Sequence, residues 1–147
     1  MNPIVAQALA RIIKDPMELL KPCVPVAGVV AVDHIIADMV KVCKTLDRGK
    51  DLGCCGLAAN QLGYNLRIIV LKKHKVFIAY INPVLELGGD VVESKELCFS
   101  FPGKKSTVSR HTSVRLTADN FKEGFVLHGR EAIAAQHEID HLNGVLI

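Results

Sequence analysis

The sequence of 147 residues has no tryptophan, and aromatic side chains make up only 5% of it. Aliphatic side chains must therefore form most of the core, which agrees with a hydrophobic content of 50%. The sequence itself indicates no secretory signal peptide, and its five cysteines are an odd number. This combination disfavours a disulfide framework and predicts reduced thiols in a cytoplasmic compartment.

Long apolar runs and a strong charge of either sign are also missing. No hydrophobic stretch reaches the ~20 residues that a membrane-spanning helix needs, so we expect no membrane partner. The net charge of +3 is too small to indicate nucleic-acid binding. With 22% charged residues and ample apolar content, the chain does not resemble a disordered protein. Its length predicts one domain over residues 1–147.

The strongest positive signal is the stretch from Gln136 to His141, in which Glu138 follows the first of two histidines. On a helix, residues four apart lie on the same face, so His137 and His141 can hold one metal ion. The glutamate beside them can then take a proton from water at that metal. The alternative is a pair of surface histidines that share a helix face by chance. Asn143-Gly144 after the motif is a typical helix end.

A metal held by two histidines needs a third protein ligand. Residues 142–147 contain no strong ligand, so the third ligand must lie upstream of the motif. This position argues against the metalloproteases whose third ligand follows the motif. Cys98 is one candidate, because it ends a strand-like run just before Pro102-Gly103. The other upstream candidates are Cys43, Cys54, Cys55, His111, His128 and several acids.

Hydrophobic periodicity predicts helices over residues 1–14 and 32–46, with a break at Asp15-Pro16. Small residues crowd positions 52–63, which predicts close approach of another backbone or a ligand, and the missing Gly-Lys-Ser/Thr ending excludes a P-loop. We expect strands at 67–71, 76–81, 84–87, 107–110 and 113–118, and turns at 88–90 and 122–124. Strands between early helices and a late one predict an α+β fold, with mainly antiparallel sheets packed around the C-terminal metal helix.

Three segments resemble the peptide deformylase family and occur in the family's order. The family pattern Gly-x-Gly-Leu-Ala-Ala-x-Gln is matched by residues 54–61, and Glu-Gly-Cys-Leu-Ser by residues 96–100. The pattern Gln-His-Glu-x-Asp-His-Leu is matched in full by residues 136–142. Two positions depart from the patterns: Cys54 replaces the first glycine, and Leu97 replaces the glycine before Cys98. The chain also lacks the C-terminal extension that many relatives carry.

The resemblance implies a metal-dependent hydrolase that removes the N-terminal formyl group from formyl-methionyl peptides and releases formate. It implies Cys98, His137 and His141 as the metal ligands and Glu138 as the proton carrier. The metal would be one divalent ion, Fe(II) first, with Zn(II), Ni(II) or Co(II) as alternatives.

Other family positions imply roles in stabilising charge and binding substrate. The Gln61 side chain and the backbone N–H of Phe99 would stabilise the oxyanion. Gly56 would let the peptide pair with the backbone as an extended strand. The remaining implied residues are Cys55, Leu97, Ile133 and Ala134 around the substrate, and Glu96 with Arg110 as a structural ion pair.

The resemblance also implies nascent formyl-Met peptides at the ribosome as partners, in the cytoplasm and without direct nucleic-acid binding. Two alternatives remain open from the sequence. The first is a metal-binding relative with weakened catalysis, which the side chains of Cys54 and Leu97 suggest. The second is a general metallopeptidase that uses the same helix.

Overall fold

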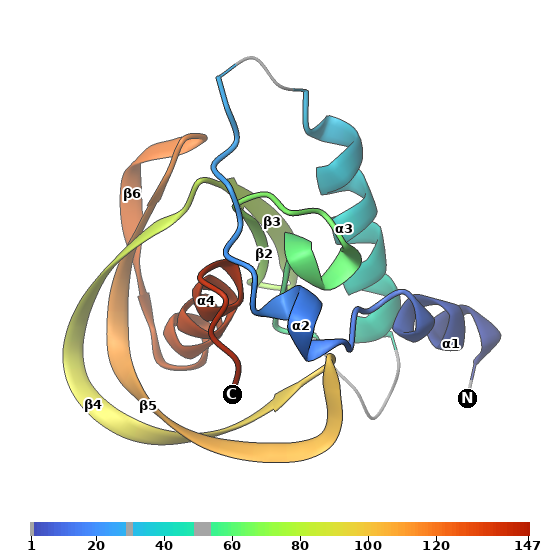
Figure 1. The fold of residues 1–147 in the computed structure, drawn as a ribbon. Helices are drawn as coiled ribbons and strands as arrows, with labels where there is room; N and C mark the ends of the chain where they lie inside the picture. The colour runs from blue at the N-terminus through green and yellow to red at the C-terminus, as the bar shows by residue number, and fades with distance from the viewer. Residues whose placement is uncertain (1, 29–30, 49–53) are drawn as a thin grey trace.

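The computed structural model describes residues 2–28, 31–48 and 54–147 (Figure 1). Residues 52 and 53 of the small-residue run lie outside these ranges. The elements are α1 (Pro3–Ala10), α2 (Pro16–Leu19), α3 (Asp33–Asp47), β1 (Gly56–Ala58), the 3-10 turn η1 (Ala59–Leu62), β2 (Ile68–Lys73), β3 (Val76–Ile81), β4 (Val84–Cys98), β5 (Phe101–Ala118), β6 (Phe121–His128) and α4 (Gly129–Leu142). None of the described helices is long and apolar enough to cross a membrane.

Each of the two N-terminal helices, α1 and α2, has a proline at its first position and a capping side chain just before it. The Asn2 side chain accepts a hydrogen bond of 2.8 Å from the Ile4 N–H, and Pro3 takes the first helical position. The Asp15 side chain accepts a bond of 2.9 Å from the Met17 N–H ahead of Pro16 in the same way. Proline suits this position because the first N–H groups of a helix have no partner within the helix. The predicted break at Asp15 is therefore also the start of a short second helix.

Two antiparallel sheets form the framework, with strand orders β1-β2-β3 and β4-β5-β6. Strand β2 is buried on both faces because its side chains alternate between two core clusters. Ile68 and Val70 pack in the first cluster, which lies against α3. Ile69 and Leu71 pack in the second cluster, which joins β5, β6 and α4.

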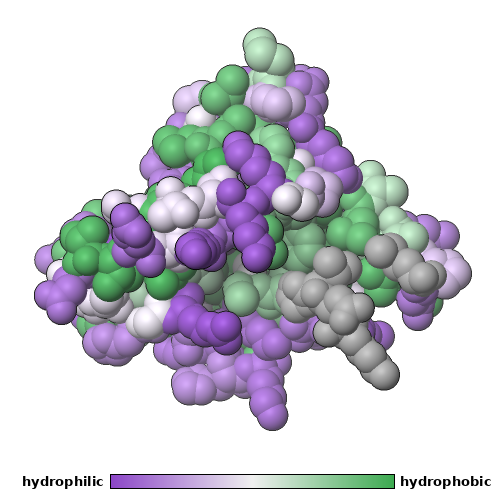
Figure 2. All heavy atoms as spheres, turned by 90° about the horizontal axis from the view of Figure 1, so that it is seen from below, coloured by the Kyte–Doolittle hydropathy of each residue, from purple (hydrophilic) through white to green (hydrophobic). Residues whose placement is uncertain are grey.

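Helix α4 lies between the two sheets, and β4, β5 and β6 bend around it (Figure 1). Its Ala132, Ala135 and Leu142 side chains are fully buried in the second cluster. The expected α+β fold, with antiparallel sheets packed around the C-terminal helix, is confirmed. On the face seen from below, hydrophilic side chains interrupt the hydrophobic ones (Figure 2).

The turns predicted at 88–90 and 122–124 are wrong. Strand β4 continues through the first, with a register shift between Gly88 and Val91, and β6 continues through the second. Gly124 has a φ of +69°, and an added Cβ would lie 2.4 Å from the Leu116 carbonyl oxygen. Glycine here permits a distortion within a paired strand and does not reverse the chain. The strands expected at 107–110 and 113–118 are likewise parts of one strand, β5.

Candidate metal centre

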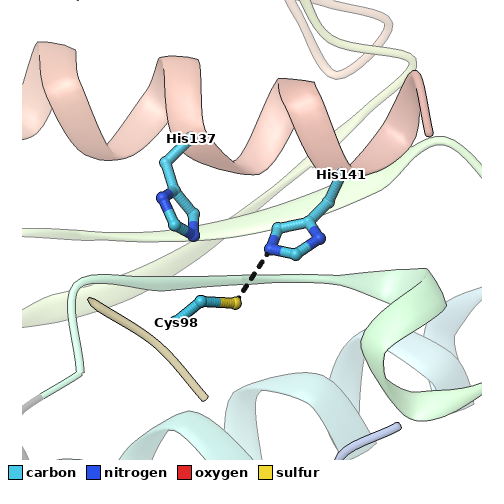
Figure 3. Close-up of side chains that lie close together, drawn as sticks. All are labelled: Cys98, His137 and His141. Atoms are coloured by element: carbon cyan, nitrogen blue, oxygen red, sulfur yellow. Dashed lines mark hydrogen bonds between the residues drawn. The ribbon is translucent and has the colours of Figure 1, made fainter. Parts of the chain in front are cut away.

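Three predicted metal ligands meet on one side of α4 (Figure 3). Their ligand atoms, the Cys98 sulfur and one imidazole nitrogen each from His137 and His141, lie within 4.8 Å of one another. The Cys98 Sγ is 3.2 Å from the His141 Nε2. Helix geometry places the two histidines on one face, and the end of β4 brings the sulfur to that face. One thiolate and two imidazoles form a donor set that suits a divalent transition metal.

A chain of charged groups orients His137. Its Nδ1 lies 2.8 Å from the Glu96 Oε1, so its Nε2 is the nitrogen left for a metal. Glu96 in turn accepts two hydrogen bonds of 2.8 Å from the Arg110 guanidinium. The remaining Arg110 nitrogen, Nη1, donates to Asp140 Oδ2 at 2.6 Å. Glu96 and Arg110 are both buried, which fixes their geometry and that of the imidazole.

The protonation of the two histidines differs. Burial lowers the pKa of His137, but hydrogen bonds with Cys98 and Glu96 and the charge of Glu138 outweigh it and raise the pKa to about 10. Burial, with the positive charges of His137 and Arg110, lowers the pKa of His141 to about 3. His141 is therefore a neutral imidazole, the form that binds metals. The groups around His137 stabilise a positive charge on its imidazole, and the same groups would stabilise a metal cation bound there.

Glu138 lies beside the three candidate ligands, and one of its carboxylate oxygens, the buried Oε2, has no hydrogen-bond partner among the described residues. Its other oxygen, Oε1, is 3.8 Å from the His137 Nε2. Burial, the main cause, raises the pKa of Glu138 to about 7. A carboxyl group with such a pKa can both take and return a proton near neutral pH.

The Gln61 side chain is held in one orientation beside the centre. Its Oε1 accepts a hydrogen bond of 3.0 Å from the Ala58 N–H, which directs the amide nitrogen to the other side. That nitrogen lies 3.2 Å from the Ser100 Oγ and 3.6 Å from the Cys98 Sγ. Turn η1 therefore places an N–H donor next to the sulfur of a candidate metal ligand.

Strand β1 passes close to Glu138. A Cβ added to Gly56 would lie 3.2 Å from the Glu138 Cγ and 2.7 Å from the Val70 carbonyl oxygen, so only glycine fits. Cys55, just before it, is exposed, and its carbonyl accepts a hydrogen bond of 2.9 Å from the Lys72 N–H. Ile133 and Ala134 are half-buried on α4.

The two departures from the family patterns have different surroundings. The Cys54 side chain is buried in the first core cluster, and its Sγ lies 3.5 Å from the Gly56 carbonyl oxygen. The Leu97 side chain is 62% exposed, at a register shift next to Cys98. Phe99 follows in the turn between β4 and β5 and packs against the first cluster. Cys54 therefore adds to the core, whereas Leu97 adds an apolar side chain to the surface beside the centre.

Sequence reasoning missed three supporting contacts. Ser100 accepts from Gln61, Asp140 pairs with Arg110, and the Asn60 side chain donates a bond of 2.8 Å to the His141 carbonyl. Ser100 and Asp140 lie inside recognised motifs, but their partners come from elements far apart in sequence. The positions of Ser100 and Asp140 within the motifs were a signal that they matter, but the motifs do not show which residues they contact.

The Glu96 ion pair leads to a prediction on stability. Burial alone would raise the pKa of Glu96, but hydrogen bonds from Arg110 and His137 lower it to about 2, from an ordinary 4.5. The folded state thus binds this proton less tightly than the unfolded state. The stabilisation, roughly 3 kcal/mol, is complete above about pH 4.5 and declines as the pH falls toward 2.

Urea unfolding of the metal-free protein checks this prediction. Wild type should exceed Glu96→Gln in free energy of unfolding at pH 6.5, and the difference should shrink at pH 3.5. Glu86→Gln, at an exposed position of the same strand, is the matched control and should show no such dependence. A difference that stays constant with pH would contradict the prediction.

Comparisons with known proteins identify relatives of the chain. The sequence model of the family described as polypeptide deformylase matches residues 9–147. The peptide deformylase of Dictyoglomus turgidum is 36% identical over 120 residues, covering 79% of this chain and 74% of that protein. The peptide deformylase of Aquifex aeolicus is 32% identical over 140 residues, covering 88% and 80%.

Solved structures are similar over nearly the whole chain. A structure of PDF from the Vibrio parahaemolyticus bacteriophage VP16T, in complex with actinonin, has a TM-score of 0.78 and 33% identity and covers 92% of this chain and 98% of that one. A probable peptide deformylase from Synechococcus phage S-SSM7 has a TM-score of 0.79 and 28% identity, covering 92% and 95%.

Proposed function

Because the chain belongs to the peptide deformylase family, we propose that it removes the formyl group from formyl-methionyl peptides at the centre beside α4. The observation that carries this proposal is the convergence of three metal-ligand atoms within 4.8 Å next to a buried carboxylate. The products are formate and a peptide with a free amino terminus. The general metallopeptidase and the weakened relative are not favoured by these comparisons.

The family is metal-dependent, and the side chains present suit one divalent ion. Cys98, His137 and His141 would hold it, with Glu96 fixing the His137 ring through Nδ1. We assign Fe(II) first, with Zn(II), Ni(II) or Co(II) as alternatives, since this donor set accepts all four. When bound, such an ion supplies Lewis-acid polarisation of the formyl carbonyl and of the attacking water.

Glu138 carries the proton in this mechanism. It takes a proton from the water as the oxygen bonds to the formyl carbon, and it returns the proton to the departing amine as the C–N bond breaks. The raised pKa, about 7, suits both transfers. Hydrogen bonds from the Gln61 amide and the Phe99 N–H would stabilise the negative oxygen that develops between the two steps.

The substrate peptide would lie extended along β1. Gly56 has no side chain to hold the peptide away from the backbone of this short strand. Cys55, Ile133 and Ala134 would contact the methionine side chain, and the exposed Leu97 would contact the peptide from the side of β4. Nascent chains at the ribosome, in the cytoplasm, are the proposed physiological substrates.

Formate release from formyl-Met-Ala-Ser tests the function. The protein is purified without oxygen and loaded with Fe(II) or Ni(II), and both formate and new amino termini are measured. We expect the two products in equal amounts, with no cleavage of unformylated Met-Ala-Ser. Cleavage of the unformylated peptide would support a metallopeptidase instead. Absence of formate with one metal bound per chain would overturn the proposal.

A further inference from the structure

Arg130 shares the face of α4 that carries the two histidines. It lies seven residues before His137 and eleven before His141. At 3.6 residues per turn, seven residues make almost two full turns, so all three side chains leave the helix in about the same direction. The rise of 1.5 Å per residue places Arg130 about 10.5 Å from His137, toward the start of the helix.

Arg130 lies on the side of the centre where β1 begins. Cys55 directly precedes Gly56, and the backbone of Gly56 lies against the Glu138 side chain. Burial raises the pKa of the Cys55 thiol, the charge of Arg130 opposes that rise, and the charge of Glu138 adds to it. Helix α4 packs against β1, and the charges of Glu138 and Arg130 both act at the thiol that precedes this strand.

The positive charge of Arg130 is not neutralised within the described residues. The side chain is exposed and forms no ion pair there. Lys72, the other cation near Cys55, already pairs with Asp47 at 2.8 Å. Of these two cations in the described part of the chain, Arg130 is thus the one that forms no ion pair and can bind a ligand at this end.

We propose that Arg130 gives the site a preference for formylated peptides with an acidic side chain at the second or third residue. The inference rests on the proposed deformylase function. An extended peptide advances about 3.4 Å per residue, so one that starts at the centre and follows β1 brings its third residue about 10 Å away. A carboxylate there meets the Arg130 guanidinium, which can bind it through two parallel hydrogen bonds.

The test compares peptides that differ only in charge. The substrates are formyl-Met-Ala-Ser, formyl-Met-Glu-Ser, formyl-Met-Ala-Glu and the corresponding lysine peptides, all as C-terminal amides so that no terminal carboxylate interferes. For the metal-loaded protein at low salt, we expect kcat/KM for the better glutamate peptide to exceed that of its lysine counterpart by about fivefold to tenfold. High salt should reduce this ratio.

Two variants and a control assign the preference to Arg130. Arg130→Gln should bring the glutamate-to-lysine ratio close to one, and Arg130→Glu should reverse it. Arg48→Gln, at an exposed arginine that follows α3, should keep the wild-type ratio. Equal rates for acidic and basic peptides in wild type, or an unchanged ratio in Arg130→Glu, would overturn the inference.

Peptide binding separates this inference from the proposed function. The same formyl peptides are titrated into metal-loaded wild type and Arg130→Glu, and dissociation constants are measured without reference to turnover. If no formate is released but glutamate peptides still bind more tightly through Arg130, the deformylase proposal falls and the preference stands. If formate is released while binding and rates ignore charge, the preference falls alone.

Discussion

Replacing Glu138 with glutamine is expected to lower kcat for deformylation by about 100- to 10,000-fold while one metal ion per chain stays bound. Glutamine has nearly the same shape, but it cannot take and return a proton. The carboxylate is buried next to His137 and has one oxygen without a partner among the described residues. Its loss therefore removes the proton transfer and leaves the three candidate metal ligands in place.

Formate release and metal content measured on the same samples check this expectation. Glu131→Gln is the matched control, because it makes the same change on the same helix at a residue that is not among the candidate site residues. The control should keep both the metal and most of the activity. Wild-type turnover in Glu138→Gln would exclude Glu138 as the proton carrier. Loss of metal in that variant would mean that its carboxylate holds the ion.

Replacing Cys98 with alanine is expected to weaken metal binding by more than about 100-fold and to abolish deformylation with it. The change removes one of the three donors that lie within 4.8 Å of one another. A lost direct ligand should cost at least as much affinity as a lost partner of a ligand, which costs roughly 10- to 100-fold. Gln61 would also lose its sulfur contact.

Metal content after dialysis against a weak chelator, with circular dichroism to verify folding, checks this second expectation. Cys23→Ala is the control, since Cys23 is a buried cysteine of the second core cluster. It should keep one metal per chain. Full metal content in folded Cys98→Ala would remove Cys98 from the ligand set and return attention to the other upstream candidates, such as His111.

The local features of this protein could be predicted from the sequence because regular periodicity determines them. The spacing of His137 and His141 places both on one helix face, whatever the rest of the fold does. The apolar periodicity over residues 32–46 predicted α3, and its Met39, Cys43 and Leu46 are fully buried.

The motif resemblance implied Cys98 as the third ligand, but the way in which it meets the histidines was decided only by the tertiary structure. Cys98 and His141 are 43 positions apart, and the path of β4 around α4 brings them to 3.2 Å. Cys43 and Cys54 were also candidates because they are thiols, but both are buried in the first core cluster.

The contacts that the sequence did not predict and the two turns that it predicted wrongly have the same cause. Gly89 and Gly124 have positive φ angles, which are equally compatible with a turn or with a distortion inside a paired strand. The Glu96–Arg110–Asp140 chain likewise joins β4, β5 and α4. Sequence periodicity specifies the direction of a side chain within its own element. Contacts between elements depend on strand register and sheet curvature, which are determined only when the whole core packs.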